Sequence, residues 1–177
     1  MILRENWVEN HSVIRDHRKT AIYYVAVQGS GRGSIRPSNS ENGAPEIRYE
    51  LSNYDIKNLS KGLARLATVL LAGGAEEVYP SVAGLPSIKT ELEAVRWLDE
   101  ELPKSSLALT TVHAFSSCPM GERQDLCAAD SYGKIFGYTN LYINDASMLP
   151  DSPGVNPQGT IMAFARRNSL HFLETSQ

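Results

Sequence analysis

The fold is decided by three consecutive blocks: His113-Ala-Phe-Ser-Ser-Cys-Pro-Met-Gly121, Asn140-Leu-Tyr-Ile-Asn-Asp-Ala-Ser-Met-Leu-Pro150 and Gly154-Val-Asn-Pro-Gln-Gly-Thr-Ile-Met162. The first block follows residues 107–112, whose apolar and β-branched side chains predict a strand. The second opens with a short predicted strand, 141–144. The third leads through a proline-rich turn into a helix predicted over 160–173. Polar side chains therefore lie at the ends of regular elements, where a rigid scaffold can hold them.

The residues upstream of these blocks predict two more strands, 21–27 and 46–51. The first is rich in β-branched and aromatic residues, and the second alternates polar with apolar side chains. Between them, Gly29, Gly31 and Gly33 resemble a phosphate loop, but neither a helix nor a Lys-Ser/Thr pair follows. We therefore expect a strand with a bulge or a close approach of two backbones.

Three helices are predicted from the spacing of apolar residues. Ser52 and Asn53 give the N-cap signal of the first, which Gly73-Gly74 ends. The second covers 90–102 and the third 160–173. The expected core residues are Ile56, Leu59, Leu63, Leu66, Val69 and Leu70, then Leu92, Val95, Trp97 and Leu98, and finally Ile161, Phe164, Ala165, Leu170 and Leu173. The predicted fold class is α+β (mixed α/β), an antiparallel-rich sheet with flanking helices.

Length and composition set limits on function. The chain has 177 residues, enough for one domain with a core, and its 42% apolar and 21% charged residues are ordinary for a globular protein. A net charge of −3 without a basic stripe argues against nucleic acid as a partner. Because no apolar run has the length of a signal peptide or a membrane span, we expect a cytoplasmic location and no membrane span.

The two cysteines, Cys118 and Cys127, lie close in sequence to His113. Their spacing fits no zinc pattern, so the expectation is two free thiols in a partly buried loop and no metal site.

His113 and Asn156 are the candidate catalytic residues. Reactions at a hydroxyl group commonly require a base that takes its proton and a second polar group that orients it. Histidine suits the first role because it exchanges a proton near neutral pH, and an amide suits the second. The simpler interpretations are a structural or solvent-exposed histidine and an asparagine that stabilises a turn.

Asp145 and the turn at Pro157 are candidates for holding a cofactor. The proline stiffens the turn, and the free N–H groups of the helix that begins near Thr160 can face an electron-rich group. Asp145 follows the predicted strand 141–144, where it is either a turn cap or part of a cofactor wall.

In combination and in order, the three blocks resemble the C-terminal signature of the glucose–methanol–choline family of flavin oxidoreductases. That pattern is a strand ending in His, a loop with Cys and Met-Gly, a strand before Asp-Ala-Ser, a proline-rich turn, and Asn-Pro or a His pair before Thr-x-Met on a helix. The segment 31–36 also resembles the family's Arg-Gly strand in the substrate domain. The resemblance covers about residues 20 to 173.

The resemblance implies FAD-dependent oxidation of an alcohol, with hydride passing to the flavin. His113 matches the family's catalytic base, and Asn156 matches the second site that binds the same oxygen. The segments that match the parts in contact with FAD contain Asp145, Ala146, Asn156, Pro157 and Thr160.

The resemblance also implies a domain division and a missing part. Residues 1–134 correspond to the substrate-binding domain, and residues 135–177 to a strand and helix that return to complete the FAD-binding domain. The family's N-terminal Gly-x-Gly-x-x-Gly unit has no counterpart, so we expect a separate or missing FAD-binding polypeptide as partner. The alternatives are a truncated, non-catalytic module that binds a partner or a small molecule, and a hydrolase using Ser116 or Ser117, which lack the usual Gly-x-Ser-x-Gly elbow.

Overall fold

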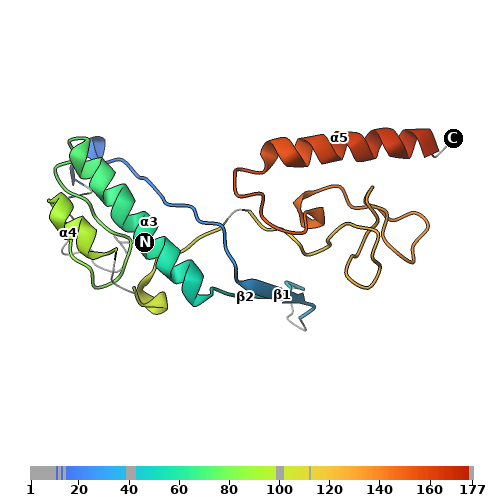
Figure 1. Cartoon of the computed structure of the whole chain (residues 1–177), viewed down its shortest axis with the longest axis horizontal. Coiled ribbons are helices and arrows are strands. Elements are labelled where there is room, and N and C mark those ends of the chain that lie inside the picture. Colours follow the sequence, from blue (N-terminus) through green and yellow to red (C-terminus); the bar gives the residue numbers. More distant parts are fainter. Residues whose placement is uncertain are drawn as a thin grey trace. The chain divides into compact units, whose positions relative to one another are not determined.

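The structure, a computed structural model, describes residues 11, 13, 15–38, 43–98, 102–111 and 113–175 (Figure 1). Its strands form one two-stranded sheet, and its α-helices from α3 onward are separated by long irregular segments. In chain order the elements are η1 (His17–Lys19), β1 (Arg32–Arg36), β2 (Glu46–Glu50), α3 (Asn53–Ala72), α4 (Glu91–Arg96), η2 (Lys104–Ser106), η3 (Ala146–Met148) and α5 (Gln158–Thr175).

The chain divides into two compact units. Unit 1 contains residues 1–32 and 50–110, and unit 2 contains residues 33–49 and 111–177. This division follows packing within the chain, so it does not test the expected boundary between a substrate part and a flavin part at residue 134. That boundary remains a prediction.

Helix α3 is the main element of unit 1, and it begins and ends at the predicted residues. The Ser52 side chain accepts a hydrogen bond from the Asp55 amide while the Asp55 side chain accepts one from the Ser52 amide. This reciprocal pair satisfies two N–H groups that have no partner within the helix. The helix ends at Gly73, and Gly74 continues the chain with φ at +98°, a conformation that glycine adopts without strain.

Helix α4 packs on α3 and forms the core of unit 1. Ala64 and Ala67 of α3 meet Ile88, Ala94 and Trp97 in one buried cluster. The observed helix covers only Glu91–Arg96 of the predicted range 90–102, and residues 99–101 lie outside the described residues. Leu92 and Val95, expected in the core, are exposed, because the short helix turns only its Ala94 side toward α3.

Asp55 joins the N-terminus of α3 to the segment that precedes β1. Its buried carboxylate accepts hydrogen bonds from the Ser30 amide at 2.7 Å, the Ser30 hydroxyl at 2.8 Å, the Gly31 amide at 2.9 Å and the Ser52 amide at 2.9 Å. Burial alone would raise the pKa of Asp55, but the hydrogen bonds from Ser30 and Ser52 outweigh it and hold the pKa well below its usual range. Asp55 is therefore a structural anion.

The β1–β2 pair confirms the strand predicted over 46–51 and the strand expected near Gly31 and Gly33. Gly31 and Gly33 allow the close approach of backbones that their sequence context predicts. A Cβ at Gly33 would lie 2.5 Å from the Arg48 carbonyl oxygen, and one at Gly31 would overlap the Glu50 carbonyl oxygen. Every residue of both strands is exposed.

Residues 21–27 are not a strand, contrary to the prediction. Their side chains favour β structure, but a strand needs a hydrogen-bonded neighbour, and the described residues provide none for this segment. The predicted strands 107–112 and 141–144 are likewise reduced to single bridges, from Leu107 to Val82 and from Tyr142 to Lys134, and residue 112 lies outside the described residues. The mixed α+β class is confirmed, with a much smaller sheet than predicted.

Unit 2 consists largely of bridged loops beneath α5. Isolated bridges join Met120 to Ala129 and Ala129 to Ile135. Of the α5 residues, only Asn168 is buried. Leu170 and Leu173 are wrong as core predictions, being 49% and 61% exposed, because the helix rests on loops along its other side.

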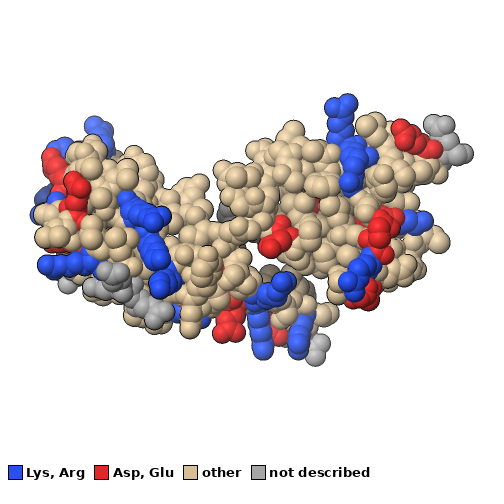
Figure 2. Space-filling model, viewed as in Figure 1, with Lys and Arg blue, Asp and Glu red and all other residues tan. Residues whose placement is uncertain are grey.

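Basic and acidic side chains are interspersed over the face of the molecule shown in Figure 2. Among the residues that the structure describes, no helix is both long enough and apolar enough to cross a membrane.

Candidate functional site

Backbone hydrogen bonds bring the first two sequence blocks together in unit 2. The Cys118 amide donates to the Ser147 carbonyl at 3.1 Å, and the Met120 amide donates to the Met148 carbonyl at 2.9 Å. On the other side of the same segment, the Gly121 amide donates to the Ala129 carbonyl at 2.9 Å. Residues 118–121 therefore lie between η3 and the loop that follows them.

Polar side chains attach α5, and with it the third block, to the second block. Asn168 donates from Nδ2 to Asn144 Oδ1 at 3.1 Å and makes a weaker contact with Met148 Sδ at 3.7 Å. Asn144 donates in turn from Nδ2 to the Ala165 carbonyl at 3.2 Å. Because buried polar groups are costly without partners, this network fixes which side of α5 faces the loops.

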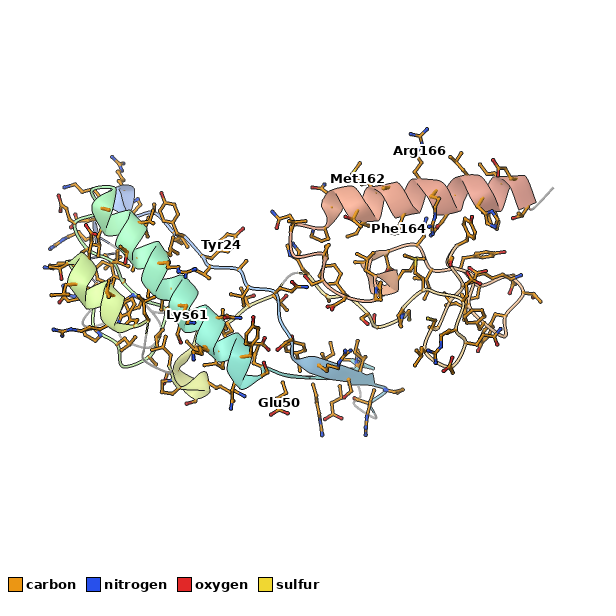
Figure 3. The ribbon with its side chains drawn as sticks, viewed as in Figure 1. Tyr24, Glu50, Lys61, Met162, Phe164 and Arg166 are labelled. Atoms are coloured by element: carbon orange, nitrogen blue, oxygen red, sulfur yellow. The ribbon has the colours of Figure 1, made fainter. Side chains whose placement is uncertain are left out.

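Aromatic and cationic contacts extend this attachment along α5. The Arg167 guanidinium lies 4.9 Å from the centre of the Tyr132 ring and 4.7 Å from that of Phe164, and it donates to the Ser131 carbonyl. Tyr132 also stacks on His171 with ring centres 3.7 Å apart. In Figure 3, Phe164 lies on the loop side of α5, whereas Met162 and Arg166 point away from it.

His113 lies on an exposed stretch that precedes residues 118–121, the segment held by the backbone hydrogen bonds described above. Its amide donates to Thr111 Oγ1 at 3.3 Å, and its ring lies 6.3 Å from the Phe115 ring at an interplanar angle of 43°. Among the described residues, the His113 ring nitrogens have no hydrogen-bond partner. They are thus accessible to a ligand.

Ser116 has an unusual backbone conformation. It lies between His113 and residues 118–121, which are hydrogen-bonded to η3 and the loop after them. Its φ is 63°, the only positive value among the described residues other than glycine. A serine in this region costs roughly 1–3 kcal/mol, and such conformations persist where the surrounding structure imposes them. The hydrogen bond from the Cys118 amide to the Ser147 carbonyl, two residues after Ser116, constrains the backbone there.

Asn156 and Pro157 directly precede α5, and Thr160 lies in its first turn. Asn156 is exposed, Pro157 is buried, and Thr160 is half-buried. The Ile161 amide donates to the Pro157 carbonyl at 2.9 Å, so the helix starts directly after the proline. Among the described residues, neither the Asn156 side chain nor the amides of residues 158–160 have a hydrogen-bond partner. A Cβ at Gly159 would meet nothing within 4 Å.

Asp145 begins the η3 turn next to Ala146. Its Oδ1 accepts a hydrogen bond from the Ser147 amide at 2.8 Å, which is the turn-cap role, one of the two roles expected of it. Asp145 is exposed and Ala146 half-buried, and among the described residues the second carboxylate oxygen of Asp145 accepts no hydrogen bond.

Hydrogen bonds therefore hold the three sequence blocks together. They do not connect all the predicted site residues with one another. Asp145 and Ala146 lie beside the clamped segment 118–121 through η3. No hydrogen bond or ring contact joins His113 to Asn156 in the described part of the chain. Their direct cooperation remains a prediction.

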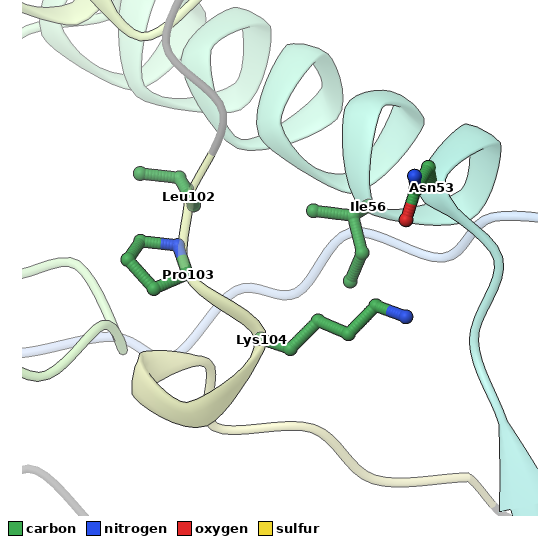
Figure 4. A pocket seen from close by; sticks show the side chains of 5 residues that line it. All are labelled: Asn53, Ile56, Leu102, Pro103 and Lys104. Atoms are coloured by element: carbon green, nitrogen blue, oxygen red, sulfur yellow. The ribbon is translucent and has the colours of Figure 1, made fainter.

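Two shallow hollows lie in unit 1, and neither contains a predicted site residue. The first, of about 230 Å³, is lined by Asn53, Ile56, Leu102, Pro103 and Lys104 (Figure 4). The second, of about 330 Å³, shares Asn53 and Lys104 and adds Arg32, Glu50, Leu51 and Ser52. Within the described residues, no three His, Cys, Asp or Glu side chains are grouped as a metal site would require.

Comparison with known families settles the ancestry of this arrangement. The model of the C-terminal part of GMC oxidoreductases matches residues 30–165, which contain all three blocks. The chain belongs to the GMC oxidoreductase family. The predicted family resemblance is thus confirmed.

Several members of the GMC family are similar over most of this chain. A GMC-type oxidoreductase of Sinorhizobium fredii is 38% identical over 165 residues, 93% of this chain and 32% of that protein. One of Mycobacterium tuberculosis is 32% identical over 145 residues, 82% and 22% of the two chains. A long-chain-alcohol oxidase of Arabidopsis thaliana is 30% identical over 155 residues, 83% and 20%. The chain spans about a third or less of the length of these relatives.

The residues of this GMC chain fit part of a flavin. The carbonyl oxygens of a flavin ring are electron-rich acceptors. The first turn of α5 offers amides that have no partner among the described residues, beside the open space at Gly159. The free carboxylate oxygen of Asp145 is suited to accept from a hydroxyl group such as those of a ribityl chain.

Sequence reasoning missed Ser116 and Asn168. A positive φ at serine has no local signal in the sequence, which indicates Ser116 only as a possible nucleophile. Asn168 could have been found from its spacing, because it lies three and four residues from Ala165 and Phe164 on the helix face that contacts the loops.

Proposed function

We propose that this chain forms the C-terminal part of an FAD-dependent oxidoreductase that acts on the CH–OH group of alcohols. The observation that carries the proposal is the assembly of the three blocks through Cys118–Ser147, Met120–Met148 and Asn144–Asn168. This assembly leaves His113 and Asn156 exposed, and within the described residues neither side chain has a hydrogen-bond partner. The name of the Arabidopsis thaliana relative, a long-chain-alcohol oxidase, supports an alcohol as substrate.

His113 serves as the base in this proposal. A ring nitrogen accepts the hydroxyl proton of the alcohol, and the amide of Asn156 donates a hydrogen bond to the same oxygen. Bound FAD would supply the hydride acceptor. Asp145, Ala146, Asn156, Pro157 and Thr160 would contact it, and the remaining contacts would come from a separate FAD-binding polypeptide or region.

The experiment asks whether the chain occurs in its native source together with a flavin and a second polypeptide. The chain is purified from its native source, and its visible spectrum is recorded alongside the intact masses of co-purifying polypeptides. Bound flavin together with a second polypeptide is the expected result. A soluble, colourless monomer that takes up no added FAD would show that this chain alone does not bind FAD.

Substitution of His113 tests the proposed base in the flavin-containing complex. His113→Ala should slow reduction of the flavin by an alcohol about 100- to 10,000-fold, the usual contribution of a positioned base. His171→Phe is the matched control, since it removes a histidine but keeps an aromatic ring on Tyr132. An unchanged rate of flavin reduction in His113→Ala would refute the assignment.

A further inference from the structure

Asn144 and Asn168 form a hydrogen-bonded pair whose two amides can point only one way. The Arg167 guanidinium donates to Asn168 Oδ1 from Nε at 3.1 Å and from Nη2 at 2.9 Å. Asn168 Nδ2 donates to Asn144 Oδ1, and Asn144 Nδ2 donates to the Ala165 carbonyl. Because a guanidinium only donates and a carbonyl only accepts, both ends of this chain of hydrogen bonds are fixed. Neither amide can therefore turn over without losing its partners.

This pair provides all the hydrogen bonds between the second sequence block and α5 in the described part of the chain. Besides the bonds just given, they include only the contact of Asn168 Nδ2 with Met148 Sδ at 3.7 Å. A ring contact joins the same two segments: Tyr142 meets Phe172 edge-on, with ring centres 5.1 Å apart. The second block is thus attached to α5 by one polar pair and one apolar contact.

A polar pair sets the position of a helix along its axis more strictly than an apolar contact does. Apolar side chains pack against any apolar neighbour, whereas a slide of α5 by one turn, about 5.4 Å, would break the bonds of both amides. Fixing the register of packed helices is the best-attested use of buried polar groups. The Asn144–Asn168 pair therefore selects one register of α5 on the second block.

That register determines how the two candidate cofactor segments lie relative to each other. Asp145 follows Asn144 directly and caps η3 next to Ala146. Thr160 lies about two turns before Asn168 on the same rigid helix, roughly 12 Å along its axis. A slide by one turn would move the start of α5 by about 5.4 Å relative to Asp145, which is more than a hydrogen bond to a shared ligand can span.

We infer that Asn144 and Asn168 are positioning residues, which hold α5 in the one register in which Asp145 and residues 156–160 reach the same bound flavin. The register follows from the hydrogen bonds, and its link to the flavin rests on the function proposed above. Both amides are occupied by each other, by Arg167 and by Ala165, so they act through the backbone that they hold.

The register can be measured without a cofactor. In the 177-residue chain, the Met148 methyl group should give a single set of nuclear Overhauser contacts to α5, centred on Asn168. Asn144→Leu/Asn168→Leu removes both amides together, so neither is left facing an unpaired partner. This double variant should show a second set of contacts, displaced along α5. A single, unshifted set in the double variant would overturn the inference.

Phe172→Leu is the matched control. It weakens the ring contact with Tyr142, which joins the same two segments, and leaves both amides in place. The single set of Met148 contacts should remain. A displaced set as strong as that of the double variant would contradict a special role for the amide pair.

The link to the cofactor is tested in the flavin-containing complex. The affinity for FAD, measured by the fluorescence of released flavin, should fall about tenfold in Asn144→Leu/Asn168→Leu, the change expected for the loss of one hydrogen bond. The absorption bands of the flavin that stays bound should shift, and Phe172→Leu should change neither property. Unchanged affinity and bands in the double variant would overturn the cofactor role. An unsubstituted complex without flavin would overturn the proposed function and with it that role, whereas the Met148 contacts decide the register by themselves.

Asn144→Asp replaces the double variant if that variant does not fold. The side chain at this exposed position still accepts from Asn168 and loses only the donor to the Ala165 carbonyl. The same displaced Met148 contacts are expected, in smaller proportion. Their complete absence would overturn the inference.

Discussion

At the residue scale, the backbone of Ser116 shows how the hydrogen bonds between the first two sequence blocks constrain the chain near His113. Its φ of 63° is in the left-handed region, which glycine tolerates and β-branched residues avoid. We expect Ser116→Gly to stabilise unit 2 by up to about 1 kcal/mol and Ser116→Val to destabilise it by about 1–3 kcal/mol. Urea unfolding followed by circular dichroism measures both. Destabilisation by glycine would show that the serine side chain outweighs the backbone cost.

Asp55 provides a second test of stability, because Asp55→Asn replaces a carboxylate with an amide of nearly the same shape. Asn at this position must turn an NH₂ group toward either the Ser30 donors or the Gly31 and Ser52 amides, so we expect Asp55→Asn to lower the free energy of unfolding by about 2–4 kcal/mol at pH 7. Ser52→Thr, which keeps a capping hydroxyl, is the control.

The same carboxylate predicts a dependence on pH. Because folding lowers the pKa of Asp55, its contribution is fully present above the pKa of the unfolded chain, about 4, and is lost as the pH falls toward the lower folded value. The difference in stability between the wild-type protein and Asp55→Asn should therefore shrink below about pH 4. A difference that is constant from pH 7 to pH 2 would mean that Asp55 is not the titrating anion.

At the scale of elements, α5 is held by a polar contact instead of an apolar stripe. Asn168→Leu should remove the donor to Asn144 Oδ1 and cost about 1–3 kcal/mol, seen as faster amide exchange along α5. Ser169→Ala is the neighbouring control, since among the described residues that hydroxyl bonds only to the Ala165 carbonyl of the same helix. Unaltered exchange in Asn168→Leu would show that the ring contacts of Arg167 and Tyr132 suffice.

Elements with local determinants could be predicted from the sequence, and those that need distant partners could not. Helix α3 follows from Ser52, Asp55 and Gly74, all within or next to it. Residues 21–27 have strand composition but gain no neighbour from the described chain. In the site, the blocks predict catalytic roles for His113 and Asn156, and these roles stay predictions. The backbone of Ser116 and the burial of Asn168 could not be predicted, because both depend on how separate loops meet.

At the scale of the whole molecule, the two compact units predict separable responses to substitution. Asp55→Asn should accelerate amide exchange in α3 and α4 of unit 1, and Asn168→Leu in α5 of unit 2, because each unit is held mainly by contacts within itself. The two losses of stability should add in the double variant to within about 0.5 kcal/mol. Acceleration throughout the chain in either single variant would instead indicate one cooperative unit.

The close contact at Gly33 has a consequence for reading mutational data on this protein. The strand that contains it is exposed along its whole length, so a map of tolerated substitutions would be expected to show permissive positions there. Yet any side chain at Gly33 would collide with the Arg48 carbonyl of the neighbouring strand. In a saturation library selected for soluble expression, this surface position should be as intolerant as a core position, and its intolerance would reflect backbone spacing with no bearing on ligand recognition.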